Sequence, residues 1–325
     1  MPCPEGALVQ SMTEAPHGSP ASSDLLQLTQ PDADFSTAAD GPVLLHALDG
    51  FLSAGHAGRL AAEHLLGADS APADVIAELD VDRLYDYRAR RPALSFDEDR
   101  YAGYEAPRLD VCRLTDAAGT AYLLLTGPEP DYRWEAFAAA VRQVVTQFGV
   151  RLVVGVGAVP MGVPHTRPIV VTAHATRSEL VDRPNLWTGR LVVPASAQAL
   201  LELRLGEAGI DAMGYVAHVP HYVSGLEFPP AVVTLLEAAG AAAGLTFDVD
   251  RLRTAAEATL AEVDRQVVEQ EGNEVLSTLE EQYDAFSRGA GQSMLARDED
   301  LPSADQLGQQ FEQFLAGLDN REGRG

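Results

Sequence analysis

The chain has no lysine, because all of its 23 basic residues are arginines. A side-chain Schiff base therefore cannot form, and the lysine with which a P-loop binds nucleotide phosphates is missing. These absences exclude pyridoxal-phosphate chemistry and Walker-type ATPase activity. Basic residues are also few beside 48 acidic ones, and the net charge of −25 argues against nucleic acid or an anionic membrane surface as a partner.

Cysteines and long apolar runs are scarce as well. Cys3 and Cys112 are the two cysteines, and no CxxC motif or His/Cys cluster accompanies them, so the sequence predicts neither structural zinc nor a disulfide framework. No run approaches the about 20 apolar residues that span a bilayer. The first residues lack the basic and apolar segments of a secretory signal. We therefore expect a cytoplasmic protein.

The remaining composition predicts one folded core between two tails. Residues 1–40 are rich in Pro, Ser, Asp and Gly, which predicts a disordered N-terminal tail. Residues 41–288 are expected to form the domain, with 252–288 as a helical extension. Residues 289–325 form an acidic tail in which helical spacing predicts a short amphipathic helix at 303–318, with Leu307, Phe311, Phe314 and Leu318 on one face.

Apolar runs typical of buried strands alternate with segments of helical periodicity in this core. Strands are predicted at 43–48, 75–79, 109–114, 122–125, 169–176, 190–194 and 212–219. A further buried strand is predicted from RLVV at 151–154, opening into the Gly/Pro-rich loop 155–168. Helices are predicted at 59–67, 134–148, 196–205 and 229–240, and over 252–286 with a break at Gly272 and Asn273. The alternation predicts an α/β fold with a mixed, mostly parallel sheet covered on both faces.

Ligands of parallel sheets bind beyond the carboxyl ends of the strands, so the loops at 49–58, 127–133, 155–168 and 219–228 are the candidate sites. The segment 155–168 contains GVGAVPMG and then His165, Thr166 and Arg167. Glycine amides and an arginine can bind an anion, which makes Gly155, Gly157, Gly162 and Arg167 a possible anion loop. The alternative is that these glycines only shape a tight turn after a buried strand.

Other chemical motifs are weak. His218 and His221 have HxxH spacing, but Pro220 lies between them and no helix is predicted there, so no metal site is predicted. No GxSxG, HExxH or paired-carboxylate motif is present. Glu129 and Asp131 flank Pro130 before a predicted helix, where acids usually serve as caps. No cofactor is expected.

Five segments in order resemble the proteasome assembly chaperone 2 family, in particular its actinobacterial members. They are LDGFLSAGHAG (48–58), ELDVDRLYDYRARRP (78–92), LLLTGPEPDYRWEAF (123–137), GAVPMGVPHTRP (157–168) and VPHYV (219–223). The resemblance implies a three-layer α/β/α, phosphorylase/hydrolase-like fold that assembles into homo-oligomers. It also implies a non-catalytic role, with proteasome α subunits as a possible partner. The first segment departs from the family pattern, since Phe51 and Ser53 stand where the family usually has Trp and Asp.

Two other functions stay open at this point. One is a hydrolase or nucleoside-phosphorylase-like enzyme, with His165 and Arg167 binding an anion and Glu129 or His221 as the acid or base. The other is a small-molecule sensor whose ligand alters its assembly. A pocket that gathers the four side chains would favour the enzyme.

Overall fold

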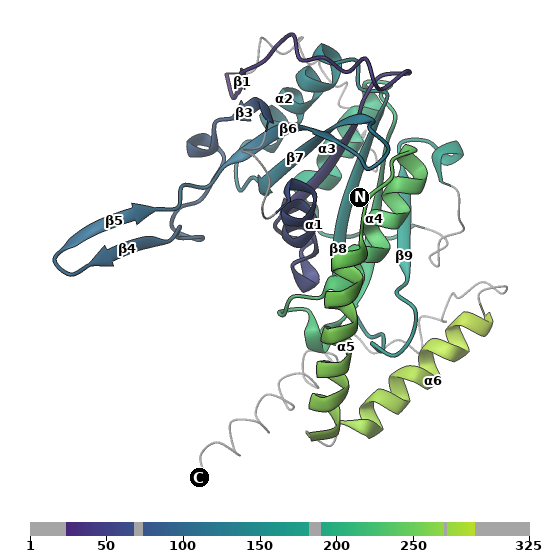
Figure 1. The fold of residues 1–325 in the computed structure, drawn as a ribbon. Helices are drawn as coiled ribbons and strands as arrows, with labels where there is room; N and C mark the ends of the chain where they lie inside the picture. The colour runs from purple at the N-terminus through teal and green to yellow at the C-terminus, as the bar shows by residue number, and fades with distance from the viewer. Residues whose placement is uncertain (1–23, 68–73, 182–189, 270–271, 290–325) are drawn as a thin grey trace, which may run out of the picture.

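The computed structural model describes residues 24–67, 74–181, 190–269 and 272–289 (Figure 1). Its strands are β1 (Leu26–Leu28), β2 (Val43–Asp49), β3 (Asp74–Leu79), β4 (Leu94–Asp97), β5 (Arg100–Tyr104), β6 (Leu109–Thr115), β7 (Ala121–Pro128), β8 (Leu152–Met161), β9 (Val171–Ala175) and β10 (Ala212–Pro220). Its α-helices are α1 (Ala57–Leu66), α2 (Trp134–Gln147), α3 (Ala197–Glu207), α4 (Pro229–Ala243), α5 (Asp250–Glu269) and α6 (Asn273–Gly289).

Eight strands form one mixed sheet in the order β1-β3-β6-β7-β2-β8-β10-β9. The central strands β7, β2, β8 and β10 are parallel to one another. The outer pairs β1–β3, β3–β6, β6–β7 and β10–β9 are antiparallel. The predicted α/β fold with a mixed sheet is confirmed, and its parallel part is the central four strands.

The alternation of side chains along β2 shows why the sheet has a helical layer on each face. Val43 and Leu45 pack in the cluster that contains α1 and α4 residues, whereas Leu44 and Leu48 pack in the cluster that contains α2 and α3 residues. Successive residues of a strand point to opposite faces, so a wholly apolar strand must be covered on both. The three-layer arrangement follows, with α5 packed outside α4 (Figure 1).

The helix boundaries follow local signals in the sequence. The Ser196 hydroxyl caps α3 by accepting a hydrogen bond from the Ala199 amide at 3.0 Å. Pro229 and Pro230 occupy the first turn of α4, where a missing N–H costs no hydrogen bond. Gly244 ends α4 in the left-handed region, at a φ of 67°. The helix therefore runs three residues beyond its predicted end at Gly240.

The prediction of a disordered tail through residue 40 is wrong for residues 24–40. Leu26–Leu28 forms β1 against the edge of β3, and Leu25 is only 2% exposed. The short apolar segment LLQL at 25–28 gains burial from β3, which composition over a long window conceals. Residues 1–23 and the predicted helix at 303–318 lie outside the described residues.

Two further differences concern strands. The predicted strand at 190–194 does not form, and Leu191, Val192 and Val193 lie exposed. No strand was predicted between residues 80 and 108, and this part of the chain contains β4 and β5. These two strands form a separate hairpin that projects from the body of the molecule (Figure 1).

Candidate functional site

Three of the candidate loops lie at the carboxyl ends of parallel strands, as predicted. The prediction of a loop at 155–168 is wrong for residues 155–161, which belong to β8, and only residues 162–168 follow the strand. The chain itself occupies much of this edge. β2 leaves β8 after His46 and Gly155, and the chain then returns to β8 where Ser53 bridges Ala158. The Ala158 amide donates to the Leu52 carbonyl at 2.9 Å. The segment after β2 therefore extends along β8, at the point where a parallel sheet commonly receives its ligand.

Gly155 and Gly157 serve this close packing. A Cβ atom on Gly155 would lie 2.4 Å from Cε1 of His46, and one on Gly157 would lie 2.9 Å from Cβ of Leu52. Both residues belong to the buried part of β8. Gly162 is the looser of the three, since a Cβ there would lie 4.0 Å from Leu279 of α6. The contacts thus explain two of the glycines by packing within the sheet.

Glu129 is buried and bonded at both carboxylate oxygens. Oε2 accepts a hydrogen bond from the Phe51 amide at 2.6 Å, and Oε1 accepts one from the Ala197 amide at 2.7 Å. Ala197 is the first residue of α3, where a negative charge is favoured by the helix dipole. Glu129 therefore joins the loop after β2 to the start of α3. It caps a helix, as expected for this acid, but the capped helix is α3 rather than α2.

Arg90 lies beside Glu129 at the end of β7, and the sequence did not indicate it as a site residue. Its Nη2 donates to the Glu129 carbonyl at 2.6 Å and pairs with Asp131 Oδ2 at 2.5 Å. The guanidinium carbon lies 4.5 Å from the centre of the Tyr85 ring. The Asp131 amide in turn donates to the Leu84 carbonyl at 2.8 Å. These bonds fix the segment that leads into the β4–β5 hairpin to the end of β7.

His165 lies at the other end of the edge, with its side chain only 1% exposed. The Tyr222 hydroxyl accepts from the His165 amide at 2.9 Å and lies 2.7 Å from the ring Nδ1. Nε2 donates to the Asp264 carboxylate of α5 at 2.9 Å, because a carboxylate can only accept. In the neutral ring Nδ1 is then the acceptor, and it receives the Tyr222 hydroxyl hydrogen. Burial raises the pKa of Tyr222. The three side chains join two loops to α5.

Arg167 is paired with α6. Its Nε and Nη2 donate to the two carboxylate oxygens of Asp284, both at 2.9 Å, and Nη1 lies 3.1 Å from Glu280. Hydrogen bonds to Asp284, followed by the charges of Asp284 and Glu280, raise the pKa of Arg167. The Tyr283 hydroxyl donates to the Pro168 carbonyl at 2.8 Å. The guanidinium of the predicted anion loop is therefore already bound by carboxylates, and that anion site stays a prediction.

The four residues of the enzyme hypothesis fall into two places. His165 and Arg167 share one loop, and the His221 ring lies edge-on to Tyr222, the partner of His165, with centres 5.3 Å apart. Glu129 is bonded to Phe51 and Ala197 instead. Sequence order could not indicate this division, because the bonds that make it join residues 57 to 117 positions apart.

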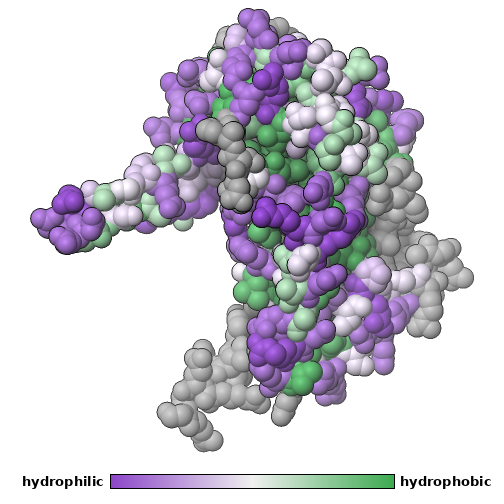
Figure 2. Space-filling view, in the orientation of Figure 1, coloured by the Kyte–Doolittle hydropathy of each residue, from purple (hydrophilic) through white to green (hydrophobic). Residues whose placement is uncertain are grey.

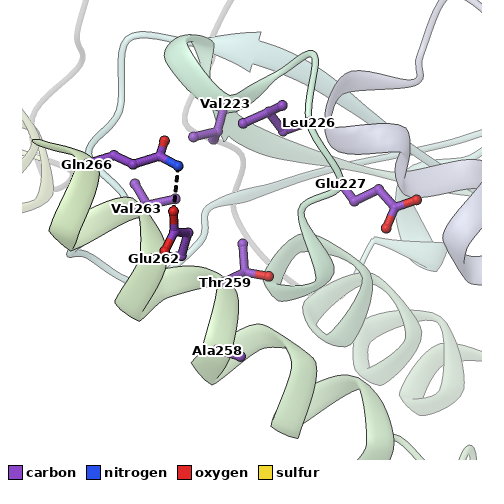
Figure 3. A pocket seen from close by; sticks show the side chains of 8 residues that line it. All are labelled: Val223, Leu226, Glu227, Ala258, Thr259, Glu262, Val263 and Gln266. Atoms are coloured by element: carbon purple, nitrogen blue, oxygen red, sulfur yellow. Dashed lines mark hydrogen bonds between the residues drawn. The ribbon is translucent and has the colours of Figure 1, made fainter.

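A hollow of about 340 Å³ lies between the loop after β10 and α5 (Figure 3). Its lining is Val223, Leu226, Glu227, Ala258, Thr259, Glu262, Val263 and Gln266. The Gln266 amide donates to Glu262 at 2.7 Å along α5, which forms one wall of the hollow. The residues predicted as catalytic or anion-binding are not in this lining. Within the described ranges, no group of three or more His, Cys, Asp or Glu side chains is placed to hold a metal ion, and no helix has the length and apolarity to cross a membrane.

Comparison with known proteins gives a consistent result. The model of the PAC2 family matches residues 47–267. A solved protein of unknown function from Mycobacterium tuberculosis is 40% identical, with 84% of this chain and 95% of that one covered and a TM-score of 0.77. One from Corynebacterium glutamicum is 36% identical, with 82% and 99% covered and a TM-score of 0.76.

A third similar structure has a functional description. It is a proteasome-assembly chaperone homologue from Mycobacterium tuberculosis, 28% identical, with 69% of this chain and 95% of that one covered and a TM-score of 0.64. No curated protein matches the chain.

Proposed function

This chain belongs to the PAC2 family, and from that premise we propose that it is a non-catalytic assembly protein that acts as a homo-oligomer in the cytoplasm. Its proposed partners are further copies of itself and proteasome α subunits. The likeness to a proteasome-assembly chaperone homologue supports the second partner. The net charge of −25 supports proteins rather than nucleic acid or membrane as the partner class.

The observation that carries the non-catalytic part of the proposal is how the strand-end side chains are used. Glu129, His165 and Arg167 are the best chemical groups at that edge, and each is bonded to other parts of the same chain. A catalytic acid, base or anion-binding group must instead meet a substrate within hydrogen-bond distance. Internal bonds of this kind favour a rigid scaffold for binding other proteins.

Co-purification tests the proposal. The full-length chain carrying an affinity tag, expressed in its own cells, is expected to retain the proteasome α subunit, and its deletion is expected to slow the formation of α-rings on native gels. A tagged protein of similar size and acidity serves as the control for charge. The proposal fails if no α subunit is retained beyond that control and α-rings assemble normally in the deletion strain.

The small-molecule sensor is a second candidate, and the hollow beside α5 is the observation that favours it. A ligand bound there would raise the melting temperature of the folded protein. Thr259→Trp would fill the hollow and abolish that shift, whereas an exposed position of the same helix, Glu257→Trp, would leave it unchanged. If no compound gives a shift that depends on Thr259, the sensor hypothesis has no remaining support.

A further inference from the structure

Two histidines lie in one row of residues on a single face of the sheet. The row runs in register across four strands, from β2 through β8 and β10 to β9, and consists of His46, Gly155, Gly214 and His174. Paired residues of neighbouring strands point to the same face, so both histidines lie on one side. His46 shares its face of β2 with Leu44, which packs in the cluster that contains α2 and α3 residues. The row therefore faces the layer of α2 and α3.

The two glycines make room for the imidazole rings. A Cβ on Gly155 would lie 2.4 Å from Cε1 and 2.5 Å from Nε2 of His46, and a Cβ on Gly214 would lie 2.3 and 2.7 Å from the same atoms of His174. Cε1 and Nε2 form the end of the ring farthest from the backbone. Because β8 and β10 are neighbouring strands, about 4.8 Å apart, the far ends of the two rings approach each other. Burial lowers the pKa of His46, and the nearby charge of His174 lowers it further.

Helix α3 presents a polar side chain to each histidine. Both carboxylate oxygens of Glu202 lie close to Nδ1 of His174, at 2.8 and 2.9 Å. A carboxylate can only accept, so Nδ1 carries the hydrogen and Nε2 of the neutral ring keeps its lone pair. Gln198 lies one turn earlier, beside His46, whose pKa it raises as a hydrogen-bonding group. A carboxylate that holds the outer nitrogen of a histidine is the usual arrangement behind metal-binding histidines.

Two buried polar atoms at this place have no partner. Nδ1 of His46 and Nε2 of Gln198 make no hydrogen bond with the part of the chain that the structure describes. The two residues are only 5% and 4% exposed. Buried polar atoms in folded proteins are nearly always paired, and a bound ion or water is the partner where the protein supplies none. The space between the row and α3 therefore lacks one component.

We propose that His46 and His174 together bind one transition-metal ion of the Zn²⁺ class between the sheet and α3. Nε2 of His174 and a ring nitrogen of His46 are the imidazole donors, and the Gln198 amide is the neighbouring oxygen donor. Imidazole nitrogen prefers Zn²⁺, Cu²⁺ or Ni²⁺ to Mg²⁺ or Ca²⁺. Glu202 is a positioning residue, because it fixes the tautomer and orientation of His174. With two imidazoles and an amide, this donor set differs from the clusters of three or more His, Cys, Asp or Glu that the described residues lack.

The ion has a path from solvent at the edge of the sheet. β9 is the last strand of the sheet, and the side chains of His174 and Glu202 are 43% and 16% exposed. The pKa of His46 is about 4, so its ring is neutral near pH 7 and loses no proton when it binds an ion. An ion held there would join β2 to β9, which β8 and β10 separate, and would brace both against α3. This site is separate from the strand-end loops and goes beyond the proposed assembly function.

Zinc titration of the full-length chain tests the proposal. Figure 2 shows hydrophilic residues over much of the surface, and the chain has 48 acidic residues, so excess Mg²⁺ is added to occupy weak carboxylate sites. The chain, without a histidine tag and after EDTA treatment, is expected to bind one Zn²⁺ in a calorimeter. His174→Ala, at the exposed edge, should weaken this binding at least tenfold while circular dichroism shows an unchanged fold. His64→Ala in α1 is the matched control and should bind like the parent.

Glu202→Gln separates metal binding from packing. It keeps the shape of the side chain but removes the charge behind His174, so the affinity for Zn²⁺ should fall by about 10–100-fold. A purely structural Glu202 would instead lower the melting temperature of the metal-free chain and leave the affinity unchanged. Zn²⁺ should raise the melting temperature of the parent more than that of His174→Ala. The site is refuted if the parent binds no more Zn²⁺ than His174→Ala does, and that result leaves the assembly function standing.

Discussion

Replacing Glu129 by alanine tests whether the strand-end edge is a structural joint. The substitution removes the acceptor of two backbone amides, those of Phe51 and Ala197, at a buried position. A hydrogen bond to a charged group contributes about 1.5–3 kcal/mol, and the two losses are not independent, so the expected loss of unfolding free energy is about 3 kcal/mol. At about 2–4 °C per kcal/mol for a domain of this size, the melting temperature should fall by about 6–12 °C.

Urea denaturation followed by circular dichroism measures this loss. Glu129→Gln keeps one acceptor but sets an amide N–H₂ against a backbone donor, so it should lose about half as much. Glu257→Ala, on the exposed face of α5, is the matched control. The structural role of Glu129 is refuted if Glu129→Ala stays within about 0.5 kcal/mol of the parent, the range of ordinary surface substitutions. A large loss of ligand binding without loss of stability would point to a binding site instead.

Three further predictions concern pH, packing and α6. Burial lowers the pKa of His46 from 6.5 to about 4, so the unfolded chain binds the proton more readily and stability falls as pH drops from about 6.5 to 4, by about 3 kcal/mol; denaturation at several pH values should show a flatter profile in His46→Leu, and parallel profiles would contradict the assignment. Gly155→Ala should cost about 1–3 kcal/mol because its Cβ would meet the His46 ring, whereas Gly162→Ala should be nearly neutral; equal melting temperatures would refute this. Arg167→Ala should speed amide hydrogen exchange in α6 while exchange in β8 is unchanged, and the ion pair has no anchoring role if α6 keeps its protection.

Periodicity predicted most of the sheet and its covering helices, because those segments bury their apolar residues within this chain. The apolar spacing of the segment from Trp134 to Phe148 fits a helix, and the apolar run from Val43 fits a buried strand. Each pattern therefore predicted one structure. Residues 190–193, also RLVV, have the same strand-favouring composition as the RLVV of 151–154, yet they pair with no strand in the described chain. Strand formation depends on an available edge, and a single segment carries no information about that edge.

The site was harder to predict because its bonds are long-range. Glu129 was recognised as a helix cap, but only the fold shows that it caps α3, 68 residues away. His165 and Arg167 were recognised as chemical groups, and their partners Asp264 and Asp284 lie in helices about 100 residues further on. Arg90 belongs to a segment rich in charged and aromatic residues, and the sequence does not show which of them meet; the cation–π contact with Tyr85 appears only in the fold.

The most direct test of the central claim is the sedimentation of purified proteasome α subunits in the presence of this chain. The proposal predicts a new boundary that contains both proteins, and a faster appearance of the ring-sized boundary than α subunits give alone. Sedimentation of the α subunits unchanged by an excess of the oligomeric chain would contradict it.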